Sequence, residues 1–128
     1  MNPIRLLLVD DEEEFLSTLK KRLSRRGFAV FTAGGGQECL DILDREAMDV
    51  VVLDVKMPGK NGVETLGEIK RLKPGTAVVL LTGHADVDMA VVGIEAGAFD
   101  YLIKPVDIDD LVYAIEDAHK SVRLGSSS

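Results

Sequence analysis

The sequence predicts an α/β fold in which five parallel strands alternate with five helices. Five short, mostly apolar segments, bounded by polar residues, Pro or Gly, alternate along the chain with five amphipathic segments of helical periodicity. Strict alternation of this kind is typical of a parallel sheet covered by helices on both faces. Because crossovers between parallel strands are right-handed, we expect a flavodoxin-like, doubly wound sheet with the strand order 2-1-3-4-5.

The predicted strands differ in how strongly the sequence supports them. Three are short and almost entirely apolar, as expected of strands that are buried on both faces. These three comprise residues 4–9, 49–53 and 77–81. Residues 28–32 and 101–103 are weaker strand candidates.

Five segments with an apolar stripe predict the helices. They are centred on residues 15–23, 40–43, 63–72, 87–96 and 111–122. Acidic residues precede the first helix and basic residues close it, a charge order that suits the helix dipole. Asp107 is a suitable N-cap for the last helix. We find no internal repeat, so residues 1–121 are predicted as one domain and residues 122–128 as a linker or the remnant of an expression tag.

Glycines mark several turns and helix ends. Gly27 is placed to stop the first helix. Pro58 and Gly59 predict a tight turn in which glycine permits a positive φ, and we expect Gly62 to adopt a similar conformation. Three consecutive glycines, residues 34–36, stand where the second helix should begin. Because each glycine weakens helix formation, we expect a late or mobile start there.

Composition limits the classes of protein that fit. The chain has 128 residues, enough for one domain, and a net charge of −7. This charge argues against direct binding of nucleic acid and favours the binding of cations. No apolar run reaches the roughly 18 residues that a membrane span needs, and no secretory signal is recognisable. We therefore expect no membrane contact. Cys39 is the single cysteine, which excludes an internal disulfide and suits a reducing cytoplasm, so we expect a cytoplasmic domain.

Residues with reactive or metal-binding side chains stand at the predicted strand ends. Asp10 and Asp11 follow the first strand, Asp54 the third, Thr82 the fourth and Lys104 the fifth. Ligands of doubly wound sheets bind beyond the carboxyl ends of the strands, where the strand order reverses. Three carboxylates at one place need a proton or a metal, and hard oxygen ligands suit Mg²⁺. A carboxylate beside a metal can accept a phosphoryl group, whose charge a lysine and a hydroxyl would stabilise.

The motifs around these residues resemble those of the response-regulator receiver family of bacterial two-component systems. The matching motifs, within residues 4–121, are Leu-Val-Asp-Asp-Glu, Val-Leu-Asp-Val-Lys-Met-Pro-Gly-Lys-Asn-Gly, Leu-Leu-Thr-Gly-His-Ala and Asp-Tyr-Leu-Ile-Lys-Pro. The resemblance implies that Asp54 is the phosphoacceptor. It also implies that Mg²⁺ is held by Asp10, Asp11, Asp54 and the backbone carbonyl of Lys56. The phosphoryl donor would be a histidine kinase.

The same resemblance implies roles for residues of the fourth and fifth strands. Thr82 and Lys104 would bind phosphoryl oxygens, and Thr82 and Tyr101 would act as the switch. The Lys104-Pro105 bond is expected to be cis, because cis bonds are largely confined to X-Pro. The domain would be a signalling module, not an enzyme in the usual sense, although it would catalyse its own phosphotransfer and slow dephosphorylation.

Phosphorylation is expected to switch one surface of the domain that contacts other proteins or domains. The fourth helix, fifth strand and fifth helix are predicted to form a face for self-association or for contact with an output domain. Met89, Val91, Val92 and Ile94 make the fourth helix too apolar to be all core. The residues around Thr82 and Tyr101 resemble receivers of nitrogen-regulatory activators, which implies control of transcription through a C-terminal domain outside this chain. A free-standing receiver would have much the same residues, so that alternative stays open.

Three other classes deserve comparison with this reading. A flavin-binding electron carrier would need a phosphate-binding loop after the first strand, where residues 10–14 are all acidic. A phosphatase of the haloacid dehalogenase type would need a second acid two residues after Asp54, where Lys56 stands. A receiver-like interaction module that is never phosphorylated is the remaining alternative, although all five site residues are present.

Overall fold

The computed structural model describes residues 2–125, and in this part of the chain strands and helices alternate as predicted. The elements are β1 (Arg5–Val9), α1 (Glu13–Arg25), β2 (Ala29–Ala33), α2 (Gly36–Arg45), β3 (Val50–Asp54), α3 (Gly62–Leu72), β4 (Ala77–Thr82), the 3-10 turn η1 (His84–Asp86), α4 (Val87–Glu95), β5 (Asp100–Ile103) and α5 (Ile108–Gly125). No helix in the described range is long and apolar enough to cross a membrane.

The five strands form one parallel sheet in the order β2-β1-β3-β4-β5, which confirms the predicted topology. The register places Val9 beside Leu53, and Thr82 beside Ile103. The carboxyl ends of β1, β3, β4 and β5 therefore lie along one edge of the sheet. The strand order reverses between β1 and β3, so this edge has the crevice expected of a doubly wound fold.

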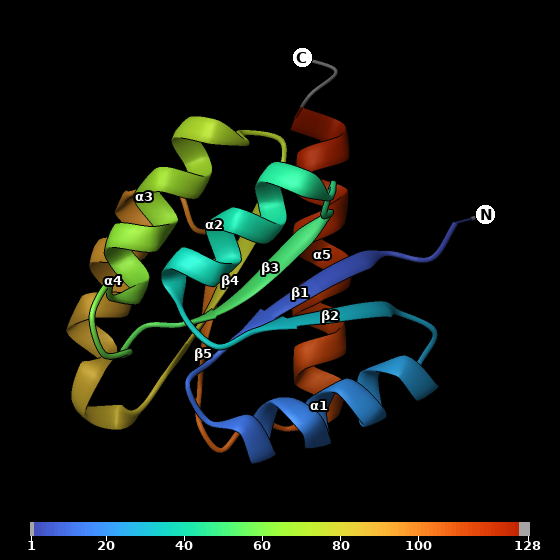
Figure 1. Cartoon of the computed structure of the whole chain (residues 1–128), viewed down its shortest axis with the longest axis horizontal. Coiled ribbons are helices and arrows are strands. Elements are labelled where there is room, and N and C mark those ends of the chain that lie inside the picture. Colours follow the sequence, from blue (N-terminus) through green and yellow to red (C-terminus); the bar gives the residue numbers. More distant parts are fainter. Residues whose placement is uncertain (1, 126–128) are drawn as a thin grey trace.

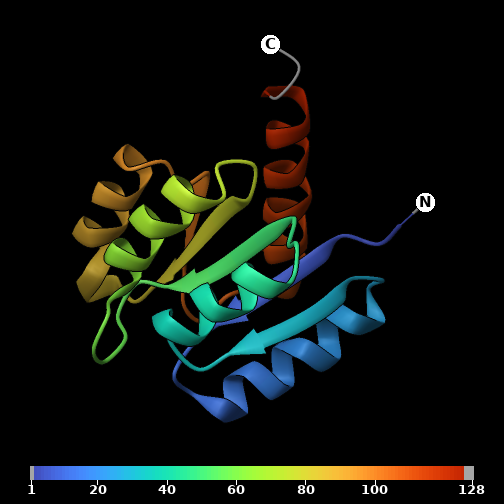
Figure 2. The same ribbon diagram turned by 45° about the horizontal axis from the view of Figure 1, so that its top comes forward.

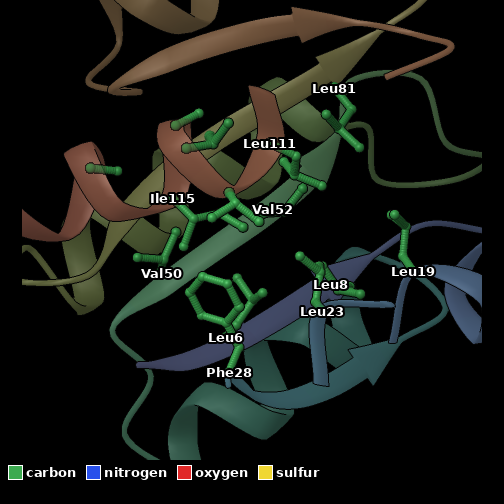
Figure 3. Close-up of a cluster of buried hydrophobic side chains, with 14 of the residues drawn as sticks. Leu6, Leu8, Leu19, Leu23, Phe28, Val50, Val52, Leu81, Leu111 and Ile115 are labelled. Atoms are coloured by element: carbon green, nitrogen blue, oxygen red, sulfur yellow. The ribbon is translucent and has the colours of Figure 1, made fainter. Parts of the chain in front are cut away.

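Helices cover both faces of the sheet. Alternate residues of each strand point to opposite layers: Leu6 and Leu8 pack with α1 and α5, whereas Leu7 and Val9 pack with α2, α3 and α4. In Figure 1, α5 passes behind the strands on the side opposite α2, and Figure 2 shows the same layers from a second direction. Figure 3 shows the cluster beneath α1 and α5. Each fully buried Leu or Ile in it contributes about 1.5–3 kcal/mol.

The helix ends follow the predicted signals. The first turn of α1 holds two glutamates and its last turn two arginines, and Gly27 follows it. The Asp107 carboxylate accepts hydrogen bonds from the amides of Asp109 and Asp110, as expected of the N-cap of α5. Helix α2 begins only at Gly36, the last of the three glycines. Of the predicted tail, residues 122–125 extend α5, and residues 126–128 lie outside the described residues.

The two glycines between β3 and α3 have different roles. Gly59 has a positive φ of 75°, as predicted for the turn after Pro58. The prediction of a similar conformation for Gly62 is wrong, because Gly62 does not have a positive φ. Its constraint is proximity instead: a Cβ at Gly62 would lie 2.3 Å from the carbonyl oxygen of Asp54 and 2.7 Å from the Cα of Val55. Glycine here lets α3 begin against the end of β3.

We expect Gly62→Ala to destabilise the domain by about 1–3 kcal/mol, the usual cost of forcing extra volume into a packed site. The obstacle is backbone, which cannot rotate away as a side chain can. Gly67→Ala is the matched control in the same helix, because Gly67 is exposed and a Cβ there would meet nothing within 4 Å. It should stabilise by about 0.5–1 kcal/mol. Urea unfolding measures both, and a Gly62→Ala variant as stable as the parent would contradict the prediction.

Candidate functional site

The predicted site residues meet at the carboxyl edge of the sheet. Asp10 follows β1, Asp54 is the last residue of β3, Thr82 the last of β4, and Lys104 follows β5. A hollow of about 610 Å³ opens at this edge. Its lining residues are Asp11, Glu12, Asp54, Lys56, Met57, Pro58, Gly83, Asp86 and Lys104.

Two carboxylates form the floor of the site. Asp10 is 1% exposed and Asp54 is 7% exposed, because each stands at the end of an apolar strand. In both residues Oδ1 accepts a hydrogen bond from the backbone amide two residues later. These bonds are 2.9 Å from Glu12 to Asp10 and 3.2 Å from Lys56 to Asp54. The local turn after each strand therefore sets the orientation of each carboxylate.

Lys104 joins the two carboxylates through their other oxygens. Its Nζ lies 2.8 Å from Oδ2 of Asp10 and 3.3 Å from Oδ2 of Asp54. Glu12 is more distant, at 4.0 Å, and its side chain is 69% exposed. One ammonium from β5 is thus shared by acids from β1 and β3, and the three strands are tied together at their ends.

The pKa values of Asp54 and Lys104 are both raised, but for different reasons. Burial raises the pKa of Asp54 to about 6, although the charge of Lys104 opposes the shift; the charge of Asp10 adds to it. For Lys104, burial lowers the pKa, but the hydrogen bond to Asp10 and the charge of Asp54 outweigh burial and raise it overall. Lys104 is therefore charged at neutral pH, and the Asp54 carboxyl exchanges its proton at mildly acidic pH.

The acids also fit a metal ion. Asp10, Asp11 and Asp54 each offer an oxygen, and these oxygens lie within 4.8 Å of one another. Asp11 is exposed, so a cation held here would keep access to water. A few carboxylates with room for water is the ligand set that Mg²⁺ prefers.

Two predicted residues lie at the margin of this arrangement. The Thr82 side chain is buried, and its hydroxyl donates a hydrogen bond to the carbonyl of Gly83 at 3.1 Å. Tyr101 is half-buried in β5 and packs against the cluster beneath α2, α3 and α4, outside the lining of the hollow. The Lys104-Pro105 bond is cis, as the resemblance implied.

Sequence reasoning missed one neighbour of Lys104 altogether. The apolar stripe of residues 15–23 predicts a core role for Phe15, yet the Lys104 ammonium lies 4.4 Å from the centre of its ring. Phe15 follows Asp11 by four residues, the spacing that brings side chains to one face of a helix. This spacing is the signal that could have placed Phe15 near the site. It is weak, because the rule applies within a helix and Asp11 stands before the first residue of α1.

A family model described as the response regulator receiver domain matches residues 6–116. The chain therefore belongs to the response regulator receiver domain family, whose members are signalling domains.

The relatives described here are transcriptional regulators by name. The transcriptional regulatory protein GlrR of Escherichia coli (strain K12) is 42% identical over 116 residues, which are 91% of this chain and 26% of that protein. The DNA-binding transcriptional regulator NtrC of Klebsiella pneumoniae is 39% identical over 111 residues, 87% of this chain and 24% of that protein. This chain thus spans about a quarter of the length of these relatives.

A solved structure shows the same fold. The response regulator receiver domain protein from Clostridium thermocellum superposes with a TM-score of 0.90 at 40% identity, over 94% of this chain and 98% of that chain.

We expect the pH dependence of stability to reveal the buried Asp54 when a chelator is present. Its raised pKa of about 6 means that the folded protein binds this proton more tightly than the unfolded chain does. Stability should therefore fall as the pH rises from about 4 to about 6. Asp54→Asn removes this titration, so its stability relative to the parent should improve across that window by on the order of 2 kcal/mol. Urea unfolding at several pH values measures the difference, and a difference independent of pH would contradict the assignment.

Proposed function

We propose that this domain accepts a phosphoryl group from a histidine kinase onto Asp54. The observation that supports the proposal is the meeting of Asp54 with Asp10, Asp11 and Lys104 at one edge of the sheet. A lone carboxylate at the end of a buried strand is costly, and a site that gathers three of them beside one ammonium favours a role for their charge.

The proposed reaction is an in-line displacement at phosphorus. A carboxylate oxygen of Asp54 attacks the phosphorus of the phosphohistidine, and the bond between phosphorus and the imidazole nitrogen breaks. The bonding electrons leave with the imidazole, and Asp54 becomes an acyl phosphate. The buried Oδ1, held by the Lys56 amide at 3.2 Å, fixes the plane of the carboxylate for this attack.

The other site residues stabilise charge on the transferred group. Lys104, already beside Asp54, would donate to a phosphoryl oxygen, and the Thr82 hydroxyl would turn from the Gly83 carbonyl to another. Asp10, Asp11, Asp54 and the Lys56 carbonyl would hold Mg²⁺. When bound, the ion supplies positive charge to the phosphoryl oxygens.

We propose that the domain also removes its own phosphoryl group, but slowly. Hydrolysis needs a water held opposite the Asp54 oxygen. Lys56 and His84 follow Asp54 and Thr82 by two positions, and both side chains are exposed. Neither is a carboxylate or an amide, and of the two only a neutral imidazole of His84 would offer that water an acceptor.

The proposed output surface is the face formed by α4, β5 and α5. Val91, Val92 and Tyr113 are 44%, 52% and 65% exposed, so the two helices leave apolar area on this face that a partner could bury. Phosphorylation would bias this face through Thr82 and Tyr101. The face would then contact a second copy or a C-terminal output domain that controls transcription, as the names of the longer relatives suggest.

Incubation with acetyl phosphate and Mg²⁺ should give an adduct that is stable in acid and labile in base. We expect Asp54→Asn to abolish it, because the nucleophilic oxygen is lost. Asp11→Asn should slow labelling by about tenfold or more, because one metal ligand is lost. Chelation of Mg²⁺ should slow it in the parent. Intact-protein mass spectrometry measures the adduct.

The control for this labelling is Asp88→Asn, which removes an exposed carboxylate of α4 and should label like the parent. Equal labelling of Asp54→Asn and the parent would place the phosphate elsewhere. An unlabelled parent would favour an interaction module that is never phosphorylated.

Beryllofluoride with Mg²⁺, which stands in for the phosphoryl group, should shift the amide resonances of α4, β5 and α5. Tyr101 links these elements, because it lies in β5 and packs against the cluster that includes α4. The matched comparison is α2, on which no such shift is expected beyond its first turn. A response limited to the residues that line the hollow would refute the coupling.

A further inference from the structure

The ring of Phe15 forms one wall of the Lys104 environment. The Lys104 Nζ lies 4.4 Å from the ring centroid, within the roughly 6 Å over which an aromatic face attracts a cation. The Lys104 side chain is only 22% exposed, so less water competes for the ammonium than at an open surface. The contact is therefore of the kind in which a ring measurably stabilises a charge.

The fold holds this ring in place from two directions. Phe15 is in the first turn of α1, which begins at Glu13, directly after the acids that follow β1. Its side chain is partly buried and packs against the core cluster beneath α1 and α5. The core thus anchors the ring, and the helix start brings it to the site.

Phe15 is also the neutral neighbour of an ammonium otherwise surrounded by acids. Asp10, Asp54 and Glu12 all approach Lys104, at 2.8, 3.3 and 4.0 Å. The oxygens of Asp10 and Asp54 would be shared with Mg²⁺, and Glu12 draws the ammonium toward solvent. An aromatic face attracts the ammonium without a lone pair that competes with phosphoryl oxygens, and it offers no ligand to a hard cation.

We propose that Phe15 is a positioning residue for phosphoryl transfer, holding the Lys104 ammonium beside Asp54 by a cation–π contact. The ring keeps the ammonium on the inner side of the site and leaves its donors free for phosphoryl oxygens. This inference rests on the proposed function, because it assigns Phe15 through the role of Lys104.

The test compares three variants for the binding of beryllofluoride at saturating Mg²⁺. Phe15→Leu keeps an apolar side chain but removes the ring, and should weaken beryllofluoride binding by roughly fivefold, the scale of a partly desolvated cation–π contact. Phe15→Tyr keeps the ring and should restore the parental affinity. Phe28→Leu is the matched control, because Phe28 is buried in the same cluster and is not among the residues placed near Lys104. It should leave the affinity unchanged.

Two further measurements separate positioning from general loss of structure. The affinity for Mg²⁺ alone should stay within twofold of the parent in Phe15→Leu, because no metal ligand changes. In the parent and in Phe15→Tyr, the ε-methylene protons of Lys104 should be shifted upfield by the ring current, and Phe15→Leu should lose that shift.

The outcomes are distinct. If the parent accepts phosphate and binds beryllofluoride, yet Phe15→Leu binds it like Phe28→Leu, the positioning role is wrong while the proposed function stands. If Phe15→Tyr fails to restore binding although it restores the ring-current shift, the contact exists but does not position Lys104. If the parent neither labels at Asp54 nor binds beryllofluoride, both the proposed function and this inference are overturned.

Discussion

The site depends on one shared ammonium. Asp10 and Asp54 are buried side by side at the ends of apolar strands, and two bare carboxylates in such a place repel each other and lack water. Lys104 lies within 3.3 Å of both and offsets part of that cost. The raised pKa of Asp54 shows that the compensation is incomplete. Because the negative charge of these carboxylates is only partly compensated, binding of a cation should stabilise the folded domain. The electrostatic cost of the site is thereby linked to its proposed chemistry.

The rest of the fold serves to hold these three groups together. The parallel sheet brings the ends of β1, β3 and β5 to one edge, although Lys104 is 50 positions from Asp54 and 94 positions from Asp10 along the chain. The turn after β3 then needs a glycine at position 62, because α3 starts in contact with the Asp54 carbonyl. Phe15 of α1 contacts the Lys104 ammonium through the face of its ring. Gly62 and Phe15 act locally: Gly62 lets the chain turn directly after Asp54, and Phe15 contacts the Lys104 ammonium.

Much of this could be predicted from the sequence, for physical reasons. Apolar runs covered on both faces and their alternation with amphipathic segments allow few topologies, so the order of the strands followed. The acids, Thr82 and Lys104 stand at strand ends, where such folds bind ligands. The prediction for Gly62 failed because a glycine required by close packing and one required by a positive φ look alike in a sequence. Their difference is a distance of 2.3 Å across the turn.

By itself, then, the sequence determined the fold class, the family and the residues that meet at the sheet edge, because strand periodicity and strand-end position depend only on the order of residues. Only the tertiary structure decided how those residues share their charges. The division of the Asp10 and Asp54 oxygens between backbone amides and Lys104 depends on distances between separate strands. The same is true of Phe15. Its position in the apolar stripe of α1 suits the core, but its ring also faces the ammonium of Lys104, which lies 89 residues later in the chain. The apolar periodicity of a helix reveals that such a side chain packs in the core, but it does not reveal a contact with a cation from a distant part of the chain.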